Sequence, residues 1–319
     1  MKDAERHPAP AYDEPERATN SLVPHWNLDS IVSQLRFSRE ISHNIRPRGS
    51  LQQSPSRDVL SDILKDLSAS LFPTHYGQSE LGRENIDYFV GSTLNRALVA
   101  LVEQVYRSLL FSGDTRNNAE VRQNAAEIVN GFADELPTIR GLLVGDVQAA
   151  LRGDPAAGDL YEIMLGYSGM TAIIYQRLAH SLYLRGAPLI ARLVAGIAHS
   201  KTGIDIHPGA EIGSNFFIDH GTGVVIGETA IIGQRVRIYQ AVTLGARSFP
   251  ADENGTLIKG KARHPIIEDD VVIYAGATIL GRVTIGRNSI IGGNVWLTHS
   301  VPANSRITQA KFREEYGTD

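Results

Sequence analysis

Cysteine is absent from this chain of 319 residues, which excludes disulfides, thiolate catalysis and cysteine-ligated metal sites. Dense lysine or arginine runs are also absent, and the formal net charge is −4, so nucleic acid is a poor candidate partner. The longest apolar stretch, around residues 189–198, contains Arg192 and is too short to cross a bilayer. No basic segment followed by an apolar one opens the chain, so no secretory signal is visible. These absences predict a cytoplasmic protein without nucleic-acid or membrane partners.

The amino-terminal part of the chain divides into two predicted regions. Residues 1–55 are rich in Pro, Glu, Arg, Ser and Asn, which predicts a flexible or loosely packed arm. Residues 56–202 carry apolar side chains at three- and four-residue spacing, which predicts an α-helical domain. The clearest stripe comprises Ile86, Phe89, Val90, Leu94, Leu98, Leu101 and Val105.

Two further helices are expected in this domain. One should begin at Pro137, because proline is favoured in a first helical turn, and end near Gly153, just before Asp154. The other should cover the apolar stripe at 173–182 and end near Gly186.

The carboxyl-terminal third has an aliphatic residue at every sixth position. These positions are Ile206, Ile212, Ile218, Val224, Ala230, Val236 and Val242, then Ile267, Ile273, Ile279, Ile285, Ile291 and Leu297. No α-helix or flat strand has this period, but a hexapeptide β-helix does, with three units making a coil of about 18 residues. The aliphatic side chains of stacked coils fill one continuous core. The pattern predicts a β-helix over residues 203–305, followed by a tail over 306–319.

The six-residue period is interrupted once. Val242 and Ile267 lie 25 residues apart, one more than four repeats, so the coil cannot simply continue. The intervening segment is rich in turn-forming residues, which predicts a loop over 246–263 that leaves the prism. The loop delivers Arg263 and His264 where the repeats resume, which favours a functional loop.

A carboxylate and an imidazole lie 15 residues apart at Asp205 and His220. With about 18 residues in a coil, this spacing places them on adjacent coils near one corner. A histidine oriented by an aspartate can deprotonate an alcohol at neutral pH. The same residues could equally form a polar turn on the prism surface, because one His–Asp pair is weak support for catalysis.

Short motifs follow one another in the repeat region and just before it. They are Gly153-Asp154-Pro155, Tyr175-Gln176-Arg177-Leu178-Ala179-His180, Asp205-Ile206-His207-Pro208, Asp219-His220-Gly221-Thr222-Gly223, Gly227-Glu228-Thr229-Ala230, Val242-Thr243-Leu244-Gly245 and Arg263-His264-Pro265. In this order they resemble the serine O-acetyltransferases of the hexapeptide-repeat superfamily over about residues 60–305. The resemblance implies an α+β fold, in which an N-terminal α-helical domain precedes a left-handed parallel β-helix of hexapeptide repeats. It also implies transfer of acetyl from acetyl-CoA to L-serine, the first step of cysteine biosynthesis.

The resemblance implies a role for each matching residue. His220 would be the general base that takes the proton from the serine hydroxyl, and Asp205 would orient it. Asp154 and Asp219 would face the serine ammonium group. No metal would take part.

The resemblance also implies residues for the other end of serine and for acetyl-CoA. Arg263 would bind the serine carboxylate, and His264 would contact the substrate or the oxyanion. Ala246, Ala275 and Gly293 match positions that hold the pantetheine arm in a groove between neighbouring prisms. A homotrimer, or a dimer of trimers joined by the helical domains, is therefore expected.

Two departures from the family pattern stand out. The loop that opens at 246–249 is longer than in many relatives and resembles a subgroup with an extended loop. The chain ends in residues 315–319 without a terminal isoleucine, so docking of the tail into O-acetylserine sulfhydrylase is not expected. Feedback inhibition by cysteine at the serine site is expected from the family.

Three alternatives remain open at this point. Another hexapeptide-repeat acetyltransferase would act on a different hydroxyl acceptor, but such relatives typically lack this helical domain. A γ-class carbonic anhydrase needs three histidines, two of them five apart, and Val225 occupies the position five beyond His220. A catalytically silent scaffold is disfavoured because all six expected site residues are present.

Overall fold

The computed structural model describes residues 26–42, 54–77, 82–112, 116–248 and 260–309, together with residues 252, 253, 256 and 258. The chain forms two units, Met1–Gly49 and Ser50–Asp319. Among the described residues, no helix is both long enough and apolar enough to cross a membrane.

The described part of the first unit is helical. Helix α1 (Leu28–Phe37) begins after Asn27, whose side chain accepts a hydrogen bond from the Ser30 amide, and continues into a π-helical turn over Ser38–Ser42. None of its side chains is buried. The predicted arm over 1–55 therefore contains a helix, while its residues 1–25 and 43–53 lie outside the description.

The predicted helical domain is present in the second unit. Its elements are α2 (Arg57–Leu71), α3 (Pro73–Tyr76), a 3₁₀ turn (Arg83–Asn85), α4 (Ile86–Phe111), α5 (Asn118–Gly153), α6 (Leu160–Gly166), α7 (Ser168–Leu184) and α8 (Pro188–Thr202). Helices α4 and α7 cover the stripes expected at 86–105 and 173–182.

The predicted helix start at Pro137 is wrong. Pro137 lies inside α5, which begins after the capping residue Asn117. A proline inside a helix costs about 3 kcal/mol. Buried apolar residues on both sides of it, including Phe132, Leu136 and Ile139, continue one packed face and outweigh that cost.

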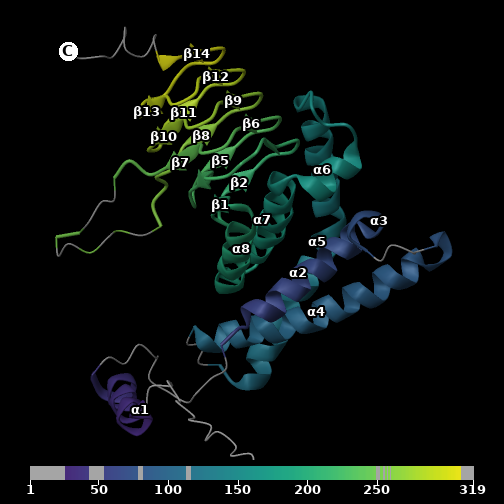
Figure 1. The fold of residues 1–319 in the computed structure, drawn as a ribbon, viewed down its shortest axis with the longest axis vertical. Helices are drawn as coiled ribbons and strands as arrows, with labels where there is room; N and C mark the ends of the chain where they lie inside the picture. The colour runs from purple at the N-terminus through teal and green to yellow at the C-terminus, as the bar shows by residue number, and fades with distance from the viewer. Residues whose placement is uncertain are drawn as a thin grey trace, which may run out of the picture. The chain divides into compact units, whose positions relative to one another are not determined.

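The repeats form a parallel β-helix. Its strands are β1 (Asp205–Ile206), β2 (Glu211–Ile212), β3 (Phe217–Ile218), β4 (Val225–Ile226), β5 (Ile231–Ile232), β6 (Arg237–Ile238), β7 (Thr243–Gly245), β8 (Ile266–Ile267), β9 (Val272–Ile273), β10 (Thr278–Leu280), β11 (Thr284–Ile285), β12 (Ile290–Ile291), β13 (Trp296–Leu297) and β14 (Arg306–Ile307). Figure 1 shows them stacked coil upon coil.

Each coil contributes one strand to each of three sheets. Sheet A has the order β1-β4-β7-β10-β13, sheet B has β11-β8-β5-β2, and sheet C has β14-β12-β9-β6-β3. Strand partners such as Val225 and Thr243, or Thr278 and Trp296, lie 18 residues apart, as the repeat predicts. The inward ladder of sheet A is buried; its members are Ile206, Ile226, Leu244, Ile279 and Leu297.

The loop and the carboxyl-terminal boundary follow from this register. Thr243 pairs with Thr278, 35 positions later, so one coil accommodates the extra loop residues without breaking sheet A. Strand β14 pairs with β12, which extends sheet C two residues past the predicted boundary at 305. Residues 310–319, which include the tail expected not to dock, lie outside the description.

The helical domain contacts the first coil. Helices α5 and α7 contact β3, and α8 contacts β1, as Figure 1 also shows for α7 and α8. A buried ion pair fixes this junction, because the Arg177 guanidinium contacts both carboxylate oxygens of Asp146 at 2.7 and 3.0 Å. Arg177 also donates to the carbonyls of Ile212 and Gly213, and Asp146 accepts from the Phe216 amide. These bonds hold the end of α5 against β3.

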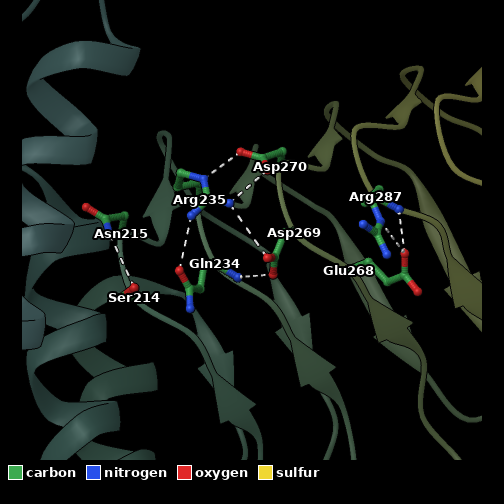
Figure 2. A network of polar contacts seen from close by, with 8 residues as sticks. All are labelled: Ser214, Asn215, Gln234, Arg235, Glu268, Asp269, Asp270 and Arg287. Carbon is green, nitrogen blue, oxygen red and sulfur yellow. Dashed lines mark hydrogen bonds and ion pairs between the residues drawn. The ribbon is translucent and has the colours of Figure 1, made fainter.

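The three corners of the prism differ in chemistry. We call the turns from sheet A to sheet B the AB corner, and name the BC and CA corners in the same way. Figure 2 shows the BC corner, where Arg235 pairs with Asp270 at 2.7 Å and with Asp269 at 3.6 Å, and Arg287 approaches Glu268. These side chains are between 40 and 75% exposed, so each pair contributes little stability, on the order of 1 kcal/mol or less.

Candidate active site

Asp154 lies at the carboxyl end of α5, directly after Gly153. Its carboxylate accepts a hydrogen bond from the Ala156 amide at 2.8 Å and one from the Tyr167 hydroxyl at 2.6 Å. The Tyr167 hydrogen bond, helped by the positive charge of Arg237, lowers the pKa of Asp154. Asp154 is therefore an ionised carboxylate at neutral pH, held beside the first coil.

Asp219 and His220 follow β3 at the CA corner. The Asp219 side chain is buried, with Oδ2 at 2.5 Å from Arg237 Nη2 and Oδ1 at 3.7 Å from His220 Nε2. His220 has a left-handed backbone, with φ of 56°, and its carbonyl accepts a hydrogen bond from the Ser168 hydroxyl. Its side chain is 73% exposed, so the imidazole is open to an incoming molecule.

Asp205 does not contact His220 through its side chain in this single chain. It opens β1 and pairs through its backbone with Val225 of β4. Among the described residues, no hydrogen bond or ion pair joins the Asp205 carboxylate to His220, whose nearest carboxylate partner is Asp219. The orienting role of Asp205 stays a prediction.

Arg263 and His264 lie at the AB corner, where the loop returns to β8. Arg263 Nη2 contacts Glu228 Oε2 at 2.7 Å, and the Tyr183 hydroxyl donates to the other oxygen of Glu228 at 3.2 Å. The Thr229 hydroxyl accepts from the Arg263 and His264 amides. The loop end is thereby tied to the turn of the preceding coil.

The tautomer of His264 follows from its contacts. The Thr229 amide donates to His264 Nδ1 at 3.0 Å, so the ring proton lies on Nε2. Burial, together with the neighbouring Arg263, lowers the pKa of His264 to about 4. His264 is therefore a neutral N–H donor at neutral pH. Gly227 is required beside it, because a Cβ at that position would collide with the imidazole ring.

The residues expected to hold acetyl-CoA also divide between corners. Ala275 and Gly293 lie on neighbouring coils of the CA corner, where the Asn294 amide donates to the Ala275 carbonyl at 2.9 Å. Ala246 follows β7 at the AB corner. The small side chains leave both turns open to a thin ligand.

The candidate residues therefore form two groups. The CA-corner group comprises Asp154, Asp219 and His220, and the AB-corner group comprises Arg263 and His264. No hydrogen bond or ion pair between described residues links one group to the other. Neither group alone offers a base, an ammonium site and a carboxylate site.

Sequence reasoning did not assign roles to several residues that hold these groups in place. Glu228 and Thr229 lie in a motif that was part of the resemblance, so their positions carried a signal. Tyr167 and Arg237 belong to no motif, and only the contacts reveal them.

Comparisons with known proteins agree with this architecture. A family model described as bacterial transferase hexapeptide (six repeats) matches residues 264–299. A Synechococcus elongatus protein named "Serine acetyltransferase, plasmid" is 56% identical over 299 residues, covering 91% of this chain and 93% of that protein. A crystal structure of Entamoeba histolytica serine acetyltransferase 1 with L-cysteine has a TM-score of 0.69 at 34% identity, over 88% of this chain and 97% of that one. A Brucella abortus serine acetyltransferase structure with coenzyme A has a TM-score of 0.50 at 29% identity, over 76% of this chain and 91% of that one.

The fold and the repeat match define the class first: the carboxyl-terminal part is a left-handed β-helix of a hexapeptide-repeat transferase. Within that class, the chain belongs to the serine acetyltransferase family. The predicted fold, the family resemblance and the acetyl-CoA-dependent acyltransferase activity are thereby confirmed. The alternatives, another acceptor or a silent scaffold, are not favoured.

Proposed function

We propose that this chain transfers acetyl from acetyl-CoA to the hydroxyl of L-serine with His220 as the general base. The exposed imidazole of His220 beside two carboxylates is the observation that carries the proposal. His220 takes the serine hydroxyl proton while the oxygen attacks the thioester carbonyl. The tetrahedral intermediate collapses, the C–S bond breaks, and the proton passes to the departing thiolate. The products are O-acetyl-L-serine and CoA, with no covalent enzyme intermediate.

Serine is bound through both of its charged ends. Asp154 and Asp219 face the ammonium group, and the Arg263 guanidinium binds the carboxylate. His264, as a neutral Nε2–H donor, contacts the oxyanion that forms on the thioester carbonyl. Asp205 orients His220 and stabilises the imidazolium once the base has accepted its proton.

The site is completed by a second copy of the chain. The ammonium and base residues lie on the CA corner, while the carboxylate and oxyanion residues lie on the AB corner of the same prism. A cyclic homotrimer places the CA corner of one subunit against the AB corner of the next, in a heterologous interface that closes. Two such trimers could pair through the helical domains into a hexamer.

Acetyl-CoA lies in the groove between neighbouring prisms. Ala275 and Gly293 come from one subunit and Ala246 from the next, so this set divides between corners in the same way as the serine set. The coenzyme A complex of the Brucella abortus relative supports this ligand class. Cysteine has the same ammonium and carboxylate groups as serine, and the Entamoeba histolytica complex with L-cysteine supports its binding as a feedback inhibitor at the serine site.

Thiol release from acetyl-CoA by the purified protein tests the reaction. L-Serine, L-homoserine, D-serine and a panel of sugars are offered in parallel. We expect rapid release with L-serine alone, and His220→Ala should lower turnover by about 10²–10⁴-fold, the usual contribution of a general base. Release with another acceptor only would overturn the substrate, and near-parental turnover in a correctly assembled His220→Ala protein would overturn the mechanism.

A further inference from the structure

Arg237 lies directly behind the two carboxylates of the CA corner. It projects from β6, one coil above Phe217, and its side chain is 23% exposed. Nη1 donates a short hydrogen bond to the Gly153 carbonyl, at the last residue of α5, and Nη2 donates to Asp219 Oδ2 at 2.5 Å. One guanidinium therefore links the end of α5 to the residue that precedes His220.

Aromatic rings fix the plane of this guanidinium. Its carbon lies 5.1 Å from the centre of the Phe217 ring and 4.6 Å from the centre of the Tyr239 ring. A guanidinium stacks on aromatic faces and donates in two directions at once, which an ammonium group cannot reproduce. Nε is buried and, within the described part of the chain, has no hydrogen-bond partner. Burying that nitrogen costs free energy, and the contacts of the guanidinium must offset that cost.

The charges of this corner also add up in an informative way. Asp154 and Asp219 each carry a negative charge, and two carboxylates close together raise each other's pKa. Arg237 opposes this effect and helps to lower the pKa of Asp154. Two anions and one cation leave one net negative charge, which matches the single ammonium group of an amino acid.

We propose that Arg237 is a positioning residue for the acceptor site: it fixes Asp219 relative to Asp154 and keeps the net charge of the pocket at −1. This inference rests on the proposed function, because it assumes that these carboxylates bind the ammonium group of serine. Asp219 Oδ2 is occupied by Arg237, which leaves Oδ1 to face His220 and the ligand.

Steady-state kinetics of two variants test the inference. In Arg237→Gln, which removes the charge, we expect the KM for L-serine to rise about tenfold or more, with a smaller change in kcat and an unchanged KM for acetyl-CoA. The acid limb of kcat/KM for serine should move to higher pH, because loss of the cation raises the pKa of the carboxylates. Arg237→Lys keeps the charge and should leave this limb at the parental pH, with an intermediate KM. The other titratable groups around the pocket, His220, Tyr167, Tyr239 and Glu162, are the same in all variants.

Arg235→Gln is the matched control. Arg235 comes from the same coil and also pairs with an aspartate, but at the exposed BC corner shown in Figure 2. It should leave the serine KM and the pH profile at parental values. A parental KM and acid limb in Arg237→Gln would overturn the inference. So would equal losses for both substrates with a parental pH profile, since these would indicate a purely structural role. Absence of serine-dependent release by the parent protein would instead overturn the proposed function.

Discussion

At the scale of single residues, the candidate site depends on contacts that fix protonation and tautomer. Thr229 makes His264 an Nε2–H donor, and Tyr167 keeps Asp154 ionised. These arrangements could not be predicted from the sequence, because the partners lie on other coils or helices. Residue types at the motif positions were predictable from the resemblance, whereas a lone arginine at position 237 of a strand had no pattern to mark it.

The lowered pKa of His264 has a consequence for stability against pH. The unfolded chain takes up a proton at this histidine below about pH 6.5, while the folded protein keeps it neutral down to about pH 4. The free energy of unfolding should therefore fall as the pH falls through this window, by up to about 3 kcal/mol from this residue. Urea unfolding between pH 4.5 and 7.5 measures the effect. His264→Asn cannot take up this proton, so its stability should fall less steeply; equal slopes would contradict the assignment.

At the scale of secondary-structure elements, the repeat was predictable and the helix boundary was not. A six-residue period is specific to one kind of structure, so the strands fell where the aliphatic positions placed them. Pro137 was misleading because a first-turn preference is a local property, whereas α5 is held by burial along its whole length. Tertiary packing of the helix outweighed the local preference.

The junction between helices and prism should depend on its buried ion pair. Asp146→Asn leaves the Arg177 guanidinium buried without its charge partner, so we expect the free energy of unfolding to fall by about 3–5 kcal/mol. Asp270→Asn breaks a similar Arg–Asp pair at the exposed BC corner (Figure 2) and should cost less than about 1 kcal/mol. Urea unfolding at one protein concentration compares the two. Similar losses in both variants would show that the pair at the junction has no special role.

At the scale of the whole molecule, the division of the site between two corners defines what one chain can do. The identities of the site residues could be predicted from the ordered motifs. Their separation could not, because it depends on which turn of each coil carries each motif and on where the loop between β7 and β8 rejoins sheet B. A single prism therefore holds two different half-sites.

Mixed oligomers test whether these half-sites meet between subunits. His220→Ala and Arg263→Ala chains, each inactive alone, are co-expressed with different tags and purified through both. Every mixed cyclic trimer contains one junction where an intact His220 faces an intact Arg263, so we expect about one third of the parental activity per trimer. Mixed oligomers with no more activity than either variant alone would place the whole site within one chain.

The contact between the helices and the first coil has a further consequence for how the chain avoids self-association. A β-helix ends in unpaired backbone donors and acceptors, and such edges add strands from other molecules. Helices α5, α7 and α8 pack against β1 and β3, at the end where the stack of coils begins. The helical domain therefore protects that end from strand addition, and loss of this cover would turn a stack of fixed length into a template for fibre growth.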